Sequence, residues 1–222
     1  MKSDEQRAWT TIVEPGEYDL HMANVGQAQA NAKIISDFLQ SNSVKRPSLI
    51  AVFGAGTGQF MDWVDPVMLK QFHWIFTDIS HRFLSELARR ANRSGLMEFQ
   101  LILADIEALE LPQLPEVTIT VLVLEHVDWQ KAVVQITACT ARTAMIVIQE
   151  NPVGMLTNVT PGREIPRSLI EGSKYANSHL IDAEALTNAM RTHGFELASN
   201  NSENVLDGKR MRALVFSRIV RD

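Results

Sequence analysis

The first regular pattern of apolar positions lies between Asp19 and about Ser41. Apolar side chains recur there at spacings of three and four, at Met22, Val25, Ala28, Ala32, Ile35 and Leu39. This spacing places them on one side of an amphipathic helix. Pro47 follows, and we expect it to separate this helix from a short strand, Ser48 to Phe53.

Short apolar runs and helical patterns alternate through the middle of the chain. Runs rich in β-branched and aromatic residues predict strands at 73–78, 99–105, 117–124 and 143–149. A short helix is expected at 59–64, and longer helices after the N-caps Ser80, Asp128 and Asp182, the last ending at Gly194. Such alternation is typical of a parallel sheet with helices on both faces.

The last part of the chain departs from this alternation. Residues 151–180 show no clean period, and we expect a long loop or lid there, with a short helix around Ser168 to Tyr175. Two runs at 195–199 and 212–220 have no helical pattern between them, so an antiparallel hairpin is expected. The predicted fold class is α/β: a Rossmann-like, seven-stranded, mostly parallel sheet with helices on both faces and one antiparallel strand from the C-terminal hairpin.

The composition favours an ordinary globular protein. With 222 residues, 45% of them hydrophobic and 21% charged, the chain can bury one core. We expect residues 1–222 to form a single domain, with residues 1–44 as an N-terminal helical cap. The first twenty residues are polar and acidic, and no apolar run reaches the roughly 18 residues of a spanning helix. A cytoplasmic protein that does not bind membranes is therefore expected.

The net charge of -5 argues against a dedicated nucleic-acid-binding protein, whose affinity would come from a basic face. Two local basic clusters are interpreted as solvent-exposed faces: Arg89, Arg90 and Arg93, and Lys209, Arg210 and Arg212.

A glycine-rich turn follows the first predicted strand, with Gly54, Gly56 and Gly58 at alternate positions. Glycines at the carboxyl end of a strand let the backbone turn sharply and let a bulky ligand approach the main chain. The dinucleotide-binding motif is G-x-G-x-x-G, and here Gln59 stands where its third glycine would fall. The spacing therefore opposes a dinucleotide.

Two acids end the next two predicted strands. Asp78 lies twenty residues after Gly58, and Asp105 ends the third strand. Because parallel strands end at the same edge of a sheet, the glycines and both acids should lie together. Asp78 could accept hydrogen bonds from ribose hydroxyls, and Asp105 from an adenine amino group. A site for a nucleotide-like cofactor is predicted.

On these residues the chain resembles the class I S-adenosylmethionine-dependent methyltransferases. The resemblance covers roughly residues 45 to 220 and includes the G-x-G-x-G turn, Asp78, the pair Asp105 and Ile106, and the sequence LEHV from Leu124. It implies a single methyltransferase-like domain that uses S-adenosyl-L-methionine. The residues that it assigns to cofactor binding are Phe53, Gly54, Ala55, Gly56, Gly58, Asp78, Ile79, Asp105, Ile106 and Leu124.

Val52 departs from the family pattern. Many family members carry Asp or Glu two residues before the first glycine, where the acid helps to organise the amino group of the cofactor's methionine. Valine accepts no hydrogen bond, so either Glu125 or an N-terminal residue such as Tyr18 takes over, or the cofactor binds weakly or not at all.

The candidate catalytic residues are His126, as a general base or a structural brace, and Glu125, which could hold a cationic substrate or the cofactor amino group. No histidines show metal-ligand spacing, so no metal is expected. We expect a small-molecule methyl acceptor, selected by the N-terminal segment and by lid residues such as Met155, Arg163, Lys174 and Tyr175, and a monomer or homodimer. The alternatives are a nicotinamide-dependent oxidoreductase and a non-catalytic binding or interaction module of the same fold.

Overall fold

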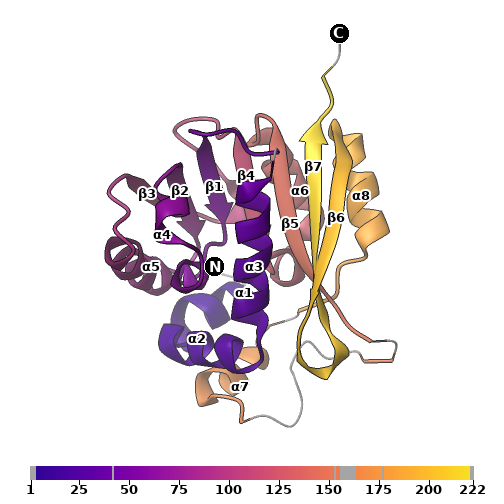
Figure 1. The fold of residues 1–222 in the computed structure, drawn as a ribbon. Coiled ribbons are helices and arrows are strands. Elements are labelled where there is room, and N and C mark those ends of the chain that lie inside the picture. Colours follow the sequence, from indigo (N-terminus) through magenta and orange to yellow (C-terminus); the bar gives the residue numbers. More distant parts are fainter. Residues whose placement is uncertain (1–3, 42, 153, 156–163, 177, 221–222) are drawn as a thin grey trace.

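The structure, a computed structural model, describes residues 4–41, 43–152, 154–155, 164–176 and 178–220. Seven strands form one sheet in the order β3-β2-β1-β4-β5-β7-β6 (Figure 1). Their bounds are β1 (Leu49–Phe53), β2 (His73–Asp78), β3 (Phe99–Leu103), β4 (Val117–Val121), β5 (Thr143–Glu150), β6 (Phe195–Asn204) and β7 (Arg210–Arg218). The first five pair in parallel, and β7 is antiparallel to both β5 and β6. The predicted fold class is confirmed.

Helices cover both faces of this sheet. Their bounds are α1 (Asp4–Arg7), α2 (Pro15–Asn24), α3 (Gln27–Gln40), α4 (Pro66–Leu69), α5 (His81–Arg93), α6 (Trp129–Ala138), α7 (Arg167–Ser173) and α8 (Ala183–Thr192). In Figure 1, α3 crosses the front of the sheet, whereas α6 and α8 lie behind it. Asp128 and Asp182 cap α6 and α8 as predicted, by accepting hydrogen bonds from the backbone of Lys131 and Ala185.

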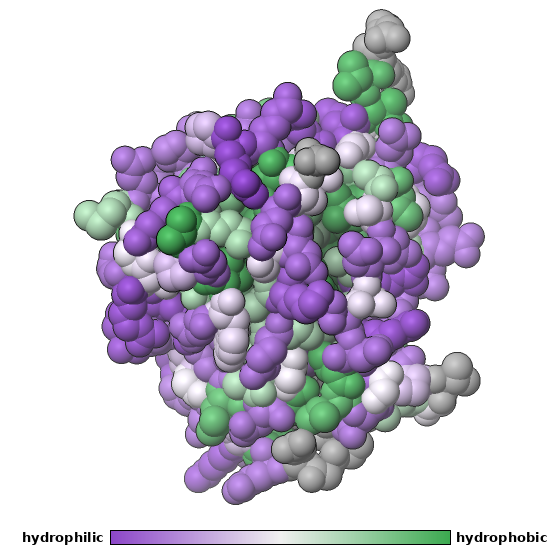
Figure 2. Space-filling view, in the orientation of Figure 1, coloured by the Kyte–Doolittle hydropathy of each residue, from purple (hydrophilic) through white to green (hydrophobic). Residues whose placement is uncertain are grey.

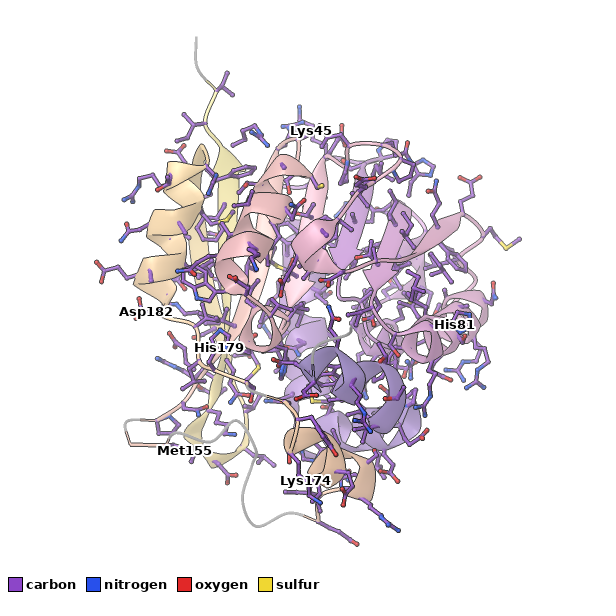
Figure 3. The ribbon with its side chains drawn as sticks, turned by 180° about the vertical axis from the view of Figure 1, so that it is seen from behind. Lys45, His81, Met155, Lys174, His179 and Asp182 are labelled. Atoms are coloured by element: carbon purple, nitrogen blue, oxygen red, sulfur yellow. The ribbon has the colours of Figure 1, made fainter. Side chains whose placement is uncertain are left out.

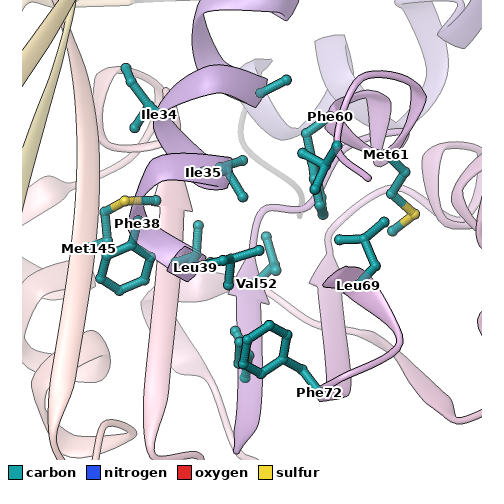
Figure 4. Close-up of a cluster of buried hydrophobic side chains, with 14 of the residues drawn as sticks. Ile34, Ile35, Phe38, Leu39, Val52, Phe60, Met61, Leu69, Phe72 and Met145 are labelled. Carbon is teal, nitrogen blue, oxygen red and sulfur yellow. The ribbon is translucent and has the colours of Figure 1, made fainter. Parts of the chain in front are cut away.

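The core consists of two apolar layers, one on each face of the sheet. Along β1, Ile50 and Val52 belong to the layer under α3, and Ala51 and Phe53 belong to the layer under α6 and α8. This alternation follows from the period of two along a strand. Figure 4 shows Val52 within the first layer, beside Leu39 of α3. The β1 strand thus buries both of its faces.

The long helix predicted from Asp19 to Ser41 is wrong in one respect. Two helices, α2 and α3, occupy this segment, because Gly26 adopts a left-handed conformation with φ of 78° between them. A further turn of α-helix, α1, and a π-helix at Ala8–Ile12 precede α2, where the sequence showed only a polar segment.

Several strand boundaries also differ from the prediction: β3 ends at Leu103 rather than at Asp105, β7 spans Arg210–Arg218 rather than 212–220, and the largest differences are at β4 and β6. The β4 strand ends at Val121, because Leu122 adopts a positive φ of 55° and residues Leu124–His126 form a turn of 3-10 helix. The β6 strand continues through the polar stretch to Asn204, since its backbone pairs with β7 along the whole hairpin. Pairing of the backbone outweighs the polar side chains at this edge of the sheet.

The two basic clusters are not wholly exposed, which corrects the sequence interpretation. Arg90 is buried and contacts Asp19 and Asp62, and Lys209 is also fully buried. Arg210 and Arg212 both pair with Glu150 at the end of β5. Elsewhere the surface in Figure 2 is mostly hydrophilic, with small apolar areas. None of the described helices is long and apolar enough to cross a membrane.

The N-terminal helices and α7 meet at the carboxyl edge of the parallel strands. Figure 1 shows α1, α2 and α7 together below the ends of β1 and β4. The Ser168 hydroxyl accepts a hydrogen bond from the Glu14 backbone, and the Ser168 backbone donates one to Glu17. Figure 3 shows Met155 and Lys174 at this end of the molecule and Lys45 at the opposite end. Arg163, the remaining lid candidate, lies outside the described residues.

Candidate active site

A cavity of about 520 Å³ opens at the carboxyl edge of the sheet. Its floor comes from the glycine turn and the ends of β2, β3 and β4, and the N-terminal segment covers it with Gln6, Trp9 and Tyr18. Of the predicted cofactor-binding residues, those that line it are Gly54, Gly56, Asp78, Ile79, Asp105 and Ile106. Its size and place are those of a cofactor site in an open α/β sheet.

The remaining four predicted residues stand behind the wall of the cavity. Phe53 and Leu124 are fully buried in the layer under α6. Ala55 donates a backbone hydrogen bond to the Thr77 carbonyl, and Gly58 begins the turn of 3-10 helix at Gln59–Asp62. On strand β4, the residues that reach the cavity are Leu122 and Val123 rather than Leu124.

The three glycines of the turn have different reasons to lack a side chain. All three have positive φ, from 58° to 68°. A Cβ atom at Gly54 would lie 2.4 Å from Val123 Cγ2, and one at Gly58 would lie 2.9 Å from Leu87 Cγ. A Cβ atom at Gly56 would meet nothing closer than Phe83, 4.0 Å away. Gly54 and Gly58 therefore permit close packing of the turn, and Gly56 alone keeps space free on the cavity side.

Asp78 links the end of β2 to the glycine turn. Its Oδ2 atom accepts a hydrogen bond of 2.8 Å from the Gly56 backbone, and its Oδ1 atom accepts one of 2.8 Å from the Ser80 backbone. Burial raises the pKa of this carboxyl to about 6, against the lowering effect of the backbone donors. Ser80 begins α5 as predicted, but Asp78 rather than the Ser80 hydroxyl makes the local capping bond.

Asp105 lies at the end of β3 and contacts the N-terminal segment. Its Oδ1 atom accepts a hydrogen bond from the Glu107 backbone, and its Oδ2 atom accepts one of 2.6 Å from the Gln6 side chain. The two predicted acids thus line one cavity, each held by donors from a neighbouring segment. Both carboxylates are positioned before any ligand binds.

Val52 contributes nothing to the cavity wall. Its side chain is buried among apolar residues of α3 and of the neighbouring strands (Figure 4). Tyr18, the N-terminal residue considered as a substitute for the missing acid, does line the cavity. Burial raises the pKa of the Tyr18 hydroxyl, so this group is a neutral donor and acceptor at physiological pH.

His126 and Glu125 follow β4 but differ in surroundings. His126 lines the cavity, and its ring lies edge-on to Trp9 with centroids 4.9 Å apart. The His126 Nδ1 atom is 3.4 Å from Glu5 Oε1. Glu125 is buried, and its Oε1 atom accepts a hydrogen bond of 2.9 Å from the Gln149 backbone. Burial raises the pKa of the Glu125 carboxyl.

A second cavity, of about 180 Å³, adjoins the first. Four residues line both cavities: Trp9, Tyr18, Leu122 and His126. Glu125 lines only the second one, together with apolar residues of the N-terminal segment and of α7 such as Val13, Met22 and Leu169. Among the described residues, no group of three or more His, Cys, Asp or Glu side chains could hold a metal ion.

Sequence reasoning missed several residues that shape this site. Gln6, Trp9 and Phe83 line the larger cavity, and Asp19 accepts hydrogen bonds from Thr57 of the glycine turn and from Arg90 of α5. Trp9 carried a signal, since a lone tryptophan in a polar N-terminal segment needs an apolar partner. The contacts of Asp19 and Gln6 carried none, because their partners are 38 to 99 residues away.

Comparison with known proteins agrees with this geometry. Residues 50–143 match a family model described as a methyltransferase domain. No curated protein sequence matches the chain. Magnesium protoporphyrin IX methyltransferase from Synechocystis PCC 6803, solved with bound S-adenosylhomocysteine, is 16% identical with a TM-score of 0.68, over 87% of this chain and 83% of that chain.

Two further solved structures extend the comparison. Phosphoethanolamine N-methyltransferase 2 from Haemonchus contortus, in complex with S-adenosyl-L-methionine, is 12% identical with a TM-score of 0.70, over 100% of this chain and 61% of that chain. The cyclase SpnF is 13% identical with a TM-score of 0.64, over 87% of this chain and 82% of that chain. At such identities the likeness concerns the fold.

The fold is that of the class I S-adenosylmethionine-dependent methyltransferases, and the resemblance found in the sequence is confirmed. The methyltransferase domain matched over residues 50–143 agrees with the predicted cofactor, S-adenosyl-L-methionine, and the two methyltransferase neighbours were solved with S-adenosylhomocysteine and with S-adenosyl-L-methionine.

Proposed function

We propose that the protein transfers a methyl group from S-adenosyl-L-methionine to a small-molecule acceptor. The observation that supports this most directly is the pair of adjoining cavities at the carboxyl edge of the sheet. The larger one contains Gly56, Asp78 and Asp105, the residues suited to a nucleoside, and the smaller one reaches it across Trp9, Tyr18 and His126. A donor site and an acceptor site that share a wall suit a direct displacement.

The residues of the larger cavity have separate tasks in this proposal. Asp78 accepts hydrogen bonds from the ribose hydroxyls. At the adenine edge, Asp105 accepts a hydrogen bond from the amino group, and the Ile106 backbone N–H donates one. Ile79 packs against the base, Gly56 leaves the main chain open to the methionine end, and Gly54 lines the same cavity. When bound, the cofactor supplies an electrophilic methyl group. The protein supplies alignment, and the transferred methyl needs no covalent help from the chain.

His126 is the proposed contact between the cofactor side and the acceptor side, because it lines both cavities. A hydroxyl acceptor would lose its proton to the imidazole, whereas a neutral amine would attack without a base. We propose that residues 1–44 and 151–180 act as cap and lid, which exclude water and restrict the acceptor to a small molecule. A cytoplasmic location, a monomer or homodimer, and no nucleic-acid partner remain part of the proposal.

Titration with S-adenosylhomocysteine tests the cofactor. Ligand at a hundredfold excess over its dissociation constant adds about 2.7 kcal/mol to the free energy of unfolding and raises the melting temperature. An Asp78→Ala variant should lose this shift. No shift with millimolar S-adenosylhomocysteine would overturn the proposal, and a shift with NAD alone would favour the nicotinamide-dependent alternative.

A second candidate is a binding or non-methylating role for the same cavities. Two observations support it: Val52 replaces the usual acid, and the neighbour SpnF is a cyclase by name. Radiolabelled S-adenosyl-L-methionine, incubated with a panel of amines, phenols and carboxylates, separates the two. Transfer of label to any acceptor supports the methyltransferase, and cofactor binding without transfer to any member favours the second candidate.

A further inference from the structure

Glu125 is a buried carboxylate with one oxygen left without a partner. The residue is 97% removed from solvent, and its Oε2 atom has no hydrogen-bond partner among the residues that the structure describes, whereas Oε1 accepts from the Gln149 backbone. A buried, unsatisfied carboxylate oxygen is costly, since it has lost its water without a replacement. Glu125 also lines the second cavity, so a ligand bound there can supply the missing donor.

The cavity that Glu125 lines is mostly apolar and aromatic, and its other polar lining residues include His21, His126, Ser173 and Ser178. Gln27 and Gln149 also border it, but their side chains bond to each other at 2.8 Å. Among the lining residues that the structure describes, there is no Lys or Arg to neutralise the carboxylate. His21 also lines this cavity, and burial together with the charge of Lys209 lowers the pKa of its imidazole.

Aromatic rings form the second element of this cavity. Trp9 and Tyr18 line it, with ring centroids 5.8 Å apart and planes nearly perpendicular. Aromatic faces attract organic cations. Burial raises the pKa of the Glu125 carboxyl, and a cation bound beside it favours the ionised form. A carboxylate that lacks a cation of its own, together with two rings, suits an ammonium group.

The volume limits the size of the ligand. A cavity of about 150 Å³ in an apolar core holds a benzene molecule, and the second cavity has about 180 Å³. The ligand that fits is therefore about one ring in size and carries an amino group. We propose that the second cavity is the acceptor subsite and that Glu125 Oε2 selects a small, apolar amine by accepting a hydrogen bond from its nitrogen. An amine that binds as the ammonium gives one proton to the Glu125 carboxylate, and the lone pair of the neutral nitrogen then attacks the methyl group. The proposal rests on the proposed methyl transfer for its purpose, but not for the binding itself.

Ligand-observed NMR with benzylamine, benzyl alcohol and toluene as probes tests this selection. The three probes share one ring and differ in the polar group. The wild-type protein, with and without saturating S-adenosylhomocysteine, should bind benzylamine at least about tenfold more tightly than benzyl alcohol, since hydrogen bonds to charged groups contribute about 1.5–3 kcal/mol. Equal affinities for the three probes would overturn the proposal.

Variants of the protein test whether Glu125 causes the preference for benzylamine. Glu125→Gln keeps an acceptor for the Gln149 backbone and should remove the preference for benzylamine, while a melting curve reports its folding. Glu171→Gln, on the outer side of α7 beside Lys174, is the matched control and should keep the preference. Ala176→Phe should block all three probes, because Ala176 lines only the second cavity.

Each result separates this proposal from the proposed function. If Glu125→Gln retained the preference for benzylamine, the carboxylate would not be the selecting group and the proposal would fail. If Glu125→Gln no longer bound S-adenosylhomocysteine, Glu125 would be part of the cofactor-binding site and the proposal would fail too. Wild-type protein that bound benzylamine selectively but never bound S-adenosylhomocysteine would support the amine site and contradict methyl transfer. Should Glu125→Gln not fold, loss of benzylamine binding in Ala176→Phe supports the site, and retained binding overturns it.

Discussion

Asp19 and the buried Arg90 form a largely buried ion pair, with 2.8 Å between Asp19 Oδ2 and Arg90 Nη2, and this pair joins α2 to α5 behind the glycine turn. The same guanidinium reaches Asp62 and donates to the Thr57 carbonyl within the turn. The Thr57 hydroxyl in turn donates to Asp19. The N-terminal cap and the cofactor turn therefore share one hydrogen-bonded network.

Replacing Arg90 by methionine should destabilise the whole domain. Breaking a buried pair by removing one partner costs about 3–5 kcal/mol, because the other charge stays buried without compensation. At about 2–4 °C per kcal/mol for a chain of this size, the melting temperature should fall by roughly 6–20 °C. Differential scanning calorimetry measures this fall.

The adjacent Arg89 provides the matched control. Its side chain is exposed and pairs only with Glu86 on the same helix. Arg89→Met should change the free energy of unfolding by less than about 0.5 kcal/mol. Equal losses for the two variants would show that the network around Arg90 adds nothing beyond a surface pair.

A methyl group at Gly54 should be far more damaging than one at Gly56. Gly54→Ala would place Cβ within 2.4 Å of Val123 Cγ2, whereas Gly56→Ala has open space. Both add about 1–2 kcal/mol for the left-handed conformation, and Gly54→Ala adds about 1–3 kcal/mol for the collision. Chemical denaturation measures both losses.

Val123→Ala should partly rescue the Gly54 variant. It removes the two methyl groups nearest to the new Cβ, so the double variant should lose less free energy than the sum of the two single variants. Strict additivity would mean that the glycine turn moves away from Val123 and that steric contact does not fix the residue type.

Restoring an acid at position 52 should harm the protein. The side chain of Val52 lies within the apolar layer under α3, away from both cavities. Val52→Asp would bury a charge without a partner, so we expect a loss of more than about 3 kcal/mol and no gain in affinity for S-adenosylhomocysteine. Val52→Ala controls for lost volume. Tighter ligand binding by Val52→Asp, measured by isothermal titration calorimetry, would contradict this account.

Local patterns predicted the elements of this fold, and contacts distant in sequence decided what the patterns missed. Period-two and period-four spacings located all seven strands and most helices, and Asp128 and Asp182 cap their helices as expected. Gly26 divides one apolar helical pattern into two helices. The pattern did not predict this break, because the spacing of apolar residues carries no information on the backbone conformation of a single residue. Arg90 looked like a surface charge because its buried partner Asp19 lies 71 residues earlier.

The candidate site was predictable where it depended on strand ends. Asp78 and Asp105 could be placed together from topology alone, since parallel strands end at one edge. Leu124 could not be placed, because the positive φ of Leu122 ends β4 early and turns Leu124 into the core. The covering residues Gln6 and Trp9 come from a segment with no periodic pattern, so only the folded chain brings them to the cavity.

The affinity for S-adenosylhomocysteine should depend on pH through Asp78. Burial raises the pKa of this carboxyl to about 6, and ribose hydroxyls donate best to its ionised form. Ligand binding therefore competes with protonation, and affinity is full above pH 7 and falls as the pH drops through 6. At pH 5 only about one tenth of the carboxyl is ionised, so the dissociation constant should be about tenfold higher than at pH 8.

The histidines that line the cavities need a separate control, because the unperturbed pKa of a histidine side chain, about 6.5, lies in the same pH range. His126 lines both cavities, and His21 lines the smaller one. Isothermal titration calorimetry of Asp78→Asn should show weak binding with a flat pH profile between 5 and 8, whereas His126→Gln should keep the slope of the wild type. If the pH dependence of the affinity vanished in His126→Gln and persisted in Asp78→Asn, the protonation that weakens binding would take place on the His126 imidazole and not on the Asp78 carboxyl.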